Sequence, residues 1–128
     1  MIRHNPPTLP APVGQYSQAV EVPAGRLLFI SGQIPEGVPG SADSAVPTGF
    51  EAQARQVWAN ILEVLAAARM TPANLVKVTT YLTDSDQIDV NGQVRREVLG
   101  ELEPALTVII ARTLDPRWLL EIEAVAAG

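Results

Sequence analysis

The chain has 128 residues, of which 47% are hydrophobic and 18% charged, a composition typical of one globular domain. Its formal charge of −5 at pH 7 disfavours a nucleic-acid or anionic-membrane partner, because both require clustered lysine and arginine. Cysteine is absent and His4 is the one histidine, which excludes disulfides, a thiol nucleophile and a thiolate or histidine-rich metal site.

These properties also set expectations for assembly and location. A chain this short leaves apolar surface unburied, so its composition predicts a single domain over residues 1–128 that forms an oligomer. No apolar run approaches the roughly 20 residues of a membrane span. The first residues lack the apolar core of a signal peptide, so we expect a cytoplasmic protein with no membrane partner.

The N-terminal third predicts a lead-in, a hairpin and a loop. Residues 1–14 hold four prolines and are expected to be extended. Alternation over 16–22 and a nearly continuous apolar run over 26–33 predict two strands, and Pro23-Ala24-Gly25 predicts the turn that joins them. Residues 35–47 are rich in Pro, Gly and Ser and predict a loop with room for one short strand. This loop is either a plain connection or a mobile rim over a pocket.

Apolar residues that recur at three- and four-residue spacing predict an amphipathic helix. The pattern begins at Phe50 and ends near residues 69–71, before Pro72. Thr48 and Glu51 have the spacing of a capping box at its start.

The C-terminal half predicts three strands and a second helix. Alternation over 75–82 predicts a strand, and valines at four-residue spacing predict a helix over 87–102. Gly92 lies inside that helix and costs about 1 kcal/mol relative to alanine. Apolar runs over 106–110 and 119–126 predict the last two strands. The order ββ(β)αβαββ predicts an α+β fold with a mixed sheet and two helices packed on one face.

Standard phosphate-binding and serine-hydrolase motifs are missing, but carboxylates are plentiful. Neither G-x-x-x-x-G-K-[ST], G-x-G-x-x-G nor G-x-S-x-G occurs. Glu121 and Glu123 share one face of the last strand, because side chains alternate along a strand. They lie either on a solvent-facing edge or in a buried site. Burial would raise the pKa of a carboxyl group and suit it to general acid or base catalysis near neutral pH.

Several short motifs follow one another along nearly the whole chain after residue 11. They are GQYSQA (14–19), ISGQIP (30–35), QARQ (53–56), NI (60–61), VKVTTYLTD (76–84), VN (90–91) and EIEAVA (121–126). In this order they resemble the Rid (YjgF) family. The resemblance implies a fold similar to chorismate mutase and a homotrimer with the sheets inward. It also implies a small-molecule ligand in a pocket at each subunit interface.

The resemblance implies a chemistry as well. Typical members of the family hydrolyse imines and enamines to 2-keto acids and ammonia, and they need neither a metal nor an organic cofactor. Some relatives carry an endoribonuclease (L-PSP) label. The acidic charge of this chain and its lack of a usable histidine count against ribonuclease activity.

Site residues follow from the resemblance position by position. Glu121 corresponds to the glutamate that holds the attacking water. The remaining expected pocket residues are Tyr16, Ser31, Gly32, Asn91, Leu106 and Thr107.

One departure from the family concerns the substrate. In the segment Pro104-Ala105-Leu106-Thr107, Leu106 stands where such members carry the arginine that clamps the substrate carboxylate. Arg112 is expected on the strand face of Leu106 but roughly 20 Å away, from where it could approach a neighbouring subunit's site. Arg69 stands where relatives carry a helix-ending glycine, a change that we interpret as structural.

Three functional hypotheses remain open. The first is a Rid-type hydrolase whose imine or enamine substrate lacks the usual carboxylate, because a buried carboxylate without its charged partner loses about 2–5 kcal/mol. The second is a non-catalytic trimer that binds a metabolite or a protein. The third is a conventional 2-imino-acid deaminase in which another arginine replaces the clamp.

Overall fold

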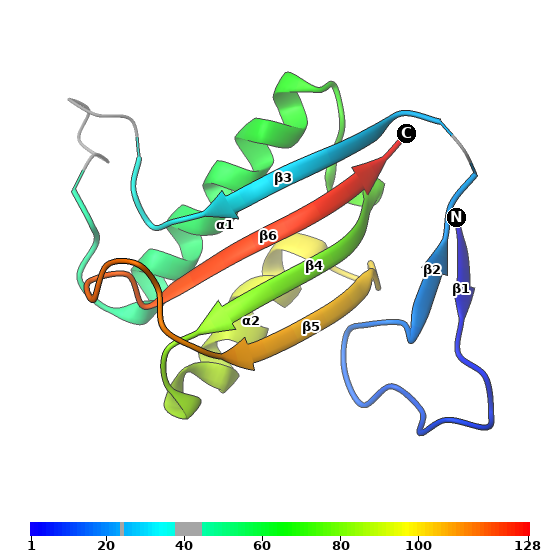
Figure 1. Cartoon of the computed structure of the whole chain (residues 1–128), viewed down its shortest axis with the longest axis horizontal. Coiled ribbons are helices and arrows are strands. Elements are labelled where there is room, and N and C mark those ends of the chain that lie inside the picture. The colour runs from blue at the N-terminus through cyan, green and yellow to red at the C-terminus, as the bar shows by residue number, and fades with distance from the viewer. Residues whose placement is uncertain (24, 38–44) are drawn as a thin grey trace.

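The computed structural model describes residues 1–23, 25–37 and 45–128 (Figure 1). In these residues the main sheet has four strands, in the order β3 (Leu27–Gln33), β6 (Leu120–Ala127), β4 (Leu75–Leu82) and β5 (Ala105–Ile110). Strands β4 and β5 are parallel, and β6 runs antiparallel to both β3 and β4. This mixed sheet confirms the predicted α+β architecture.

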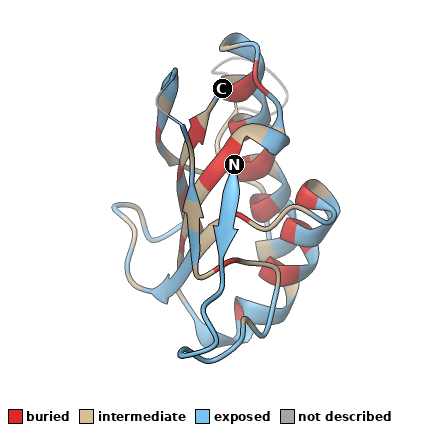
Figure 2. Cartoon of the chain, turned by 90° about the vertical axis from the view of Figure 1, so that its right-hand side faces the viewer, coloured by how far each residue is buried: buried red, intermediate tan, exposed pale blue. Residues whose placement is uncertain are grey.

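Two helices cover one face of the sheet. These are α1 (Phe50–Ala67) and α2 (Ile88–Leu99), each preceded or followed by a short 3-10 turn, η1 (Pro72–Asn74) and η2 (Ser85–Gln87). Figure 2 shows both helices on the same side of the sheet, with buried residues between the two layers. Neither helix, within the part of the chain that the structure describes, combines the length and apolar composition that a membrane crossing needs.

The predicted N-terminal hairpin is wrong. Strand β2 (Ala19–Glu21) pairs antiparallel with β1 (Ile2–His4), inside the segment expected to be an extended lead-in. His4 Nε2 lies 2.7 Å from Glu21 Oε2, and the backbone N–H of Gln18 donates to Asn5 Oδ1 at 2.7 Å. These contacts hold the N-terminus against β2. Strands β1 and β2 form a two-stranded sheet of their own, separate from the main sheet (Figure 1). Ala24 of the predicted turn, and residues 38–44 of the predicted 35–47 loop, lie outside the described residues.

Helix α1 forms as predicted, but its ends differ from expectation. Gly49 caps its start with φ 90°, and the predicted capping box of Thr48 and Glu51 does not form. The side chain of Gln53 bonds near the helix start instead, donating to the carbonyl of Pro47 at 3.0 Å. At the other end Arg69 adopts φ 59°, a left-handed conformation that glycine adopts at lower cost. The expectation of a structural role for this position agrees with that backbone.

Helix α2 is shorter than the predicted 87–102, because Gly100 with φ 58° ends it directly after Leu99.

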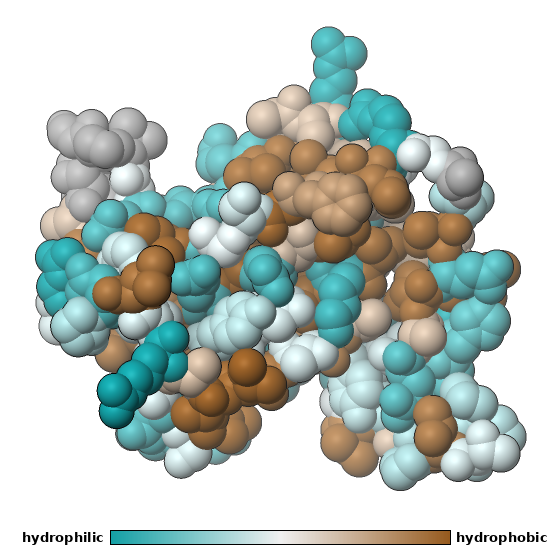
Figure 3. Space-filling model, viewed as in Figure 1, coloured by the Kyte–Doolittle hydropathy of each residue, from teal (hydrophilic) through white to brown (hydrophobic). Residues whose placement is uncertain are grey.

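The core lies between the sheet and the helices. Alternate residues of β6 face the helices and are buried, while Glu121, Glu123 and Val125 lie on the other side. We call that side the open face. It carries exposed apolar side chains, including Phe29 with 73% exposure and Ile109 with 44%. Figure 3 shows hydrophobic residues gathered on this face over β3.

Candidate active site

Glu121 lies on the open face, where β6 passes between β3 and β4. The β3–β6 register is interrupted between Ile30 and Gln33, so Ser31 and Gly32 together occupy the space opposite one residue of β6. This bulge brings the Gly32 backbone against the Glu121 side chain, which is half-buried. A Cβ at residue 32 would lie 2.8 Å from the Glu121 carboxylate carbon. Glycine is therefore what permits this contact.

The chain beyond Gly32 is fixed by helix α1. Asn60 Nδ2 donates to the carbonyl oxygens of Ile34 at 3.0 Å and of Glu36 at 2.9 Å. Gln56 of the QARQ motif in turn donates to Asn60 Oδ1 at 2.9 Å. Gln56 and Asn60 thus serve the fold, because they hold the segment that follows the Ser31-Gly32 bulge. This support positions the backbone against which Glu121 packs.

A hollow of about 190 Å³ adjoins Glu121 on the side of β4 and β5, and Tyr81, Arg112, Thr113 and Leu114 form the rest of its lining. The sequence placed Arg112 about 20 Å from Leu106 on the same strand face. Strand β5 ends at Ile110, and after the Ala111 N–H bonds to the carbonyl of Leu82 the chain leaves the sheet. Strand alternation then no longer applies, and Arg112 reaches the hollow of its own chain's Glu121.

The second carboxylate of the strand has a partner on β4. Tyr81 Oη donates to Glu123 Oε1 at 2.9 Å. This hydrogen bond and burial raise the pKa of Tyr81 above its ordinary value, because both favour the neutral phenol. The prediction that Glu121 and Glu123 share one face is confirmed, and that face is open in the single chain.

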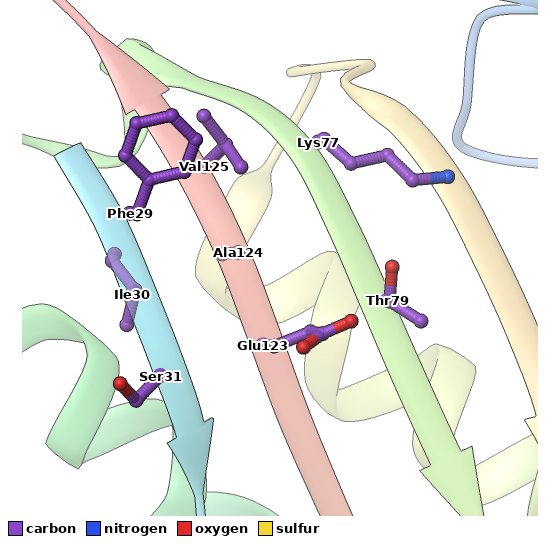
Figure 4. A pocket seen from close by; sticks show the side chains of 8 residues that line it. All are labelled: Phe29, Ile30, Ser31, Lys77, Thr79, Glu123, Ala124 and Val125. Atoms are coloured by element: carbon purple, nitrogen blue, oxygen red, sulfur yellow. The ribbon is translucent and has the colours of Figure 1, made fainter. Parts of the chain in front are cut away.

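A larger hollow of about 330 Å³ lies next to Glu123 on the open face, and Figure 4 shows its lining. Ser31 comes from β3, whereas Lys77 and Thr79 come from β4. Lys77 extends toward β5, where its Nζ donates to Thr107 Oγ1 at 2.7 Å. Ser31 therefore lies beside Glu123, and its neighbour Gly32 lies beside Glu121.

Three other expected residues gather at the β5 edge of the sheet. Ser17 forms a parallel bridge to Ala105 and its Oγ donates to the carbonyl of Glu103 at 2.8 Å, which holds Tyr16 near the start of β5. Leu106 is opposite Val78, so it faces the helices and packs against the core. Thr107 lies on the open face. Because β3 and β5 are opposite edges, this group does not meet Gly32 within one chain.

Asn91 lies in the helical layer, apart from Glu121. It is 3% exposed on α2, which covers the sheet face opposite the open face. Arg95 follows one turn later and is 9% exposed. Burial lowers the pKa of Arg95, and its Nε has no hydrogen-bond partner among the described residues.

Sequence reasoning missed Tyr81 as part of the Glu121 hollow. Tyr81 is the cross-strand partner of Glu121, and only the sheet register shows this pairing. The available signal in the sequence was the alternation along β4, which places Tyr81 on the same strand face as Lys77 and Thr79. In the described ranges no group of three or more acidic or histidine side chains is placed to hold a metal ion.

Comparisons with known proteins agree with this fold. The family model described as endoribonuclease L-PSP matches residues 7–128. A RutC family protein of Pyrococcus horikoshii is 38% identical over 117 residues, covering 91% of this chain and 90% of that protein. A 2-iminobutanoate/2-iminopropanoate deaminase of Bos taurus is 35% identical over 117 residues, covering 91% and 82%.

A solved structure is also similar over nearly the full length. It is the Rid family protein YyfB of Yersinia pestis, described as of unknown function, with a TM-score of 0.84 and 32% identity. The match covers 99% of this chain and 98% of that one. The chain therefore belongs to the Rid (YjgF) family, which the endoribonuclease L-PSP model describes.

Proposed function

We propose that the chain hydrolyses a small imine or enamine, with Glu121 positioning the attacking water. The observation that carries this proposal is the Glu121 carboxylate, held against the Gly32 backbone at the edge of a hollow. The deaminase name of the bovine relative supports the reaction class.

The reaction needs only water and a base. The water oxygen attacks the imine carbon while Glu121 accepts a proton from the water. That proton passes to the nitrogen, which gives a carbinolamine. The hydroxyl proton of the carbinolamine is then transferred to the nitrogen as well, the remaining carbon–nitrogen bond breaks, and ammonia leaves with formation of a carbonyl product. An enamine substrate first takes a proton on carbon to become the imine. Backbone N–H groups near the bulge stabilise the developing charge.

The substrate in this proposal lacks a carboxylate next to the reacting carbon. Leu106 offers an aliphatic side chain that packs on the core, where a clamp would need a guanidinium. A substrate carboxylate buried there without a charged partner would lose about 2–5 kcal/mol of binding.

The proposal includes a homotrimer with the open faces inward. Exposed apolar residues on that face, such as Phe29 and Ile109, support burial against other copies. In such a trimer Gly32 and Glu121 of one chain would approach the β5 edge of the next, with its Tyr16, Leu106 and Thr107. Sedimentation of the purified protein tests this assembly, and a monomer at micromolar concentration would contradict it.

The test of the function follows imine loss by trapping with semicarbazide. Neutral imines are generated in situ by an amine oxidase, and 2-imino acids by an amino-acid oxidase. We expect the wild type to hydrolyse neutral imines well above the buffer rate, and Glu121→Gln to lose about 100-fold or more. Glu63→Gln, on the outer surface of α1, is the matched control and keeps the wild-type rate.

Leu106→Arg completes the design. In the proposed trimer the β5 edge carries position 106 to the Glu121 of the next chain. We expect the variant's guanidinium, which is too polar to stay against the core, to turn toward that site and bind the carboxylate of 2-imino acids, so that activity on them is gained. If neither the wild type nor Leu106→Arg hydrolyses any imine, the catalytic proposal is wrong and a binding function replaces it. If the wild type already prefers 2-imino acids, the substrate part of the proposal is wrong.

A further inference from the structure

Arg112 is the cationic residue in the lining of the Glu121 hollow. It lines the same small hollow as Glu121 and Tyr81, and its side chain is exposed. Among the described residues it makes no ion pair within 4.0 Å and no hydrogen bond through its guanidinium. Arg55 and Arg117, by contrast, lie 2.6 Å and 2.7 Å from Glu97 and Asp115. The Arg112 guanidinium is therefore available to a ligand that enters the hollow.

The register places Arg112 differently from a clamp at residue 106. Glu121, Tyr81 and Ile109 form one row across β6, β4 and β5, and Arg112 follows three residues after that row. Leu106 lies three residues before it, about 10 Å along the strand, and faces the helices. Within one chain, the lining of the Glu121 hollow thus includes the Arg112 side chain, whereas position 106 lies outside it.

The charges around the hollow explain what a cation would do there. Glu121 and Glu123 both lie on this face, and the whole chain carries a net charge of −5. An anionic substrate approaching Glu121 would be repelled by both carboxylates. A guanidinium in the lining of the same hollow offsets this repulsion and can bind a carboxylate through two parallel hydrogen bonds.

We propose that Arg112 binds a carboxylate of the substrate that is separated from the reacting carbon by further carbon atoms. This inference rests on the proposed function, in which the substrate has no carboxylate next to the reacting carbon. The substrate class is then an imine or enamine with a distal carboxylate. The reacting carbon lies at the Glu121 water, and the chain extends across the hollow to Arg112.

Three four-carbon imines test this assignment with matched length. They are the imines that oxidases form from 4-aminobutanoate, from butylamine and from 2-aminobutanoate, with a distal carboxylate, no carboxylate and an adjacent carboxylate. We expect kcat/KM to be about tenfold or more higher for the distal carboxylate than for the neutral imine. Arg112→Gln should remove most of that preference through KM, and Arg112→Lys should retain part of it.

Arg96→Gln is the control, because Arg96 is exposed on the outer surface of α2, away from the open face. It should keep the wild-type preference. Thermal unfolding of each variant verifies that it folds. A wild type with no preference for the distal carboxylate, or an Arg112→Gln variant that keeps it, would overturn the assignment. A preference for the adjacent carboxylate would overturn it as well.

A binding measurement separates this inference from the proposed function. Butanoate cannot react, so calorimetric titration with butanoate reports the anion site alone. If no imine is hydrolysed but butanoate binds the wild type and loses about tenfold in affinity with Arg112→Gln, the reaction fails and the Arg112 site stands. If butanoate binds both proteins equally, or binds neither, the site assigned to Arg112 is wrong.

Discussion

Replacing Gly32 with alanine should separate activity from stability at the Glu121 site. The new Cβ would lie 2.8 Å from the Glu121 carboxylate carbon and 3.2 Å from its Cγ. Carbon atoms in ordinary contact are about 3.5–4.0 Å apart, so the carboxylate must move by about 1 Å. The atoms that must move are the far end of a flexible side chain, and the backbone can remain in place.

The expected magnitudes differ for the two properties. A displacement of about 1 Å in a catalytic group costs about 100-fold in rate, which corresponds to about 2.7 kcal/mol of transition-state stabilisation. Stability should change by less than about 1 kcal/mol, because alanine also reduces the entropy of the unfolded chain. Gly32→Ala should therefore be folded and nearly inactive.

Two quantities are measured for the wild type and for Gly32→Ala: kcat/KM on the wild type's best imine, and the midpoint of urea unfolding. Gly25→Ala is the matched control, since its Cβ would meet the carbonyl oxygen of Gly128 at an ordinary 3.8 Å. In the Glu121→Ala background, Gly32→Ala should have no further effect on rate, because the group it displaces is gone. Full activity in Gly32→Ala, or an additive loss in the double variant, would refute the reasoning.

Three further predictions concern stability and titration. Arg69→Gly should raise the free energy of unfolding in urea by about 1 kcal/mol, because it relieves a left-handed backbone; an unchanged midpoint would show that Arg69 makes a compensating contact. Arg95→Met should stabilise the fold by about 1–3 kcal/mol, because it removes a buried donor without a partner; a loss of stability in the same measurement would reveal a partner for that guanidinium. The raised pKa of Tyr81 means that its contribution is present below pH of about 10 and is lost as pH rises through the folded pKa. Ultraviolet titration of the phenol should show a lower pKa in Glu123→Gln, and an unchanged titration would exclude Glu123 as the cause.

Periodicity in the sequence predicted most of the fold. Helix α1 and strands β4 and β6 each bury a regular stripe of residues. The spacing of apolar residues within each element is therefore enough to predict its type. The spacing of apolar residues could not predict that β2 pairs with β1. A turn signal at residues 23–25 indicates that the chain changes direction, but the partner of a three-residue strand depends on side-chain contacts such as His4 with Glu21.

Some residues of the candidate site were predictable from the sequence, and others depend on the arrangement of the strands. Glu121 and Gly32 were identified by family resemblance, and the bulge in β3 supplies the physical reason for their contact. Tyr81 could not be assigned, because its neighbour across the sheet depends on register. Arg112 was misplaced because strand alternation was extended past the end of β5.

The segment that carries Arg112 is fastened at both of its ends. Upstream, the Ala111 N–H donates to the carbonyl of Leu82 at 2.7 Å. Downstream, the buried side chain of Gln53 accepts from the Leu119 N–H at 2.8 Å and donates to the carbonyl of Arg117 at 2.9 Å. The Thr113 side chain holds the turn between these anchors by donating to the carbonyl of Trp118 at 2.8 Å. The exposed residues Arg112 and Leu114 can therefore change in chemistry while the sheet keeps its register. With the role proposed for Arg112, substrate choice would be set at these exposed positions, separately from the glutamate and its glycine.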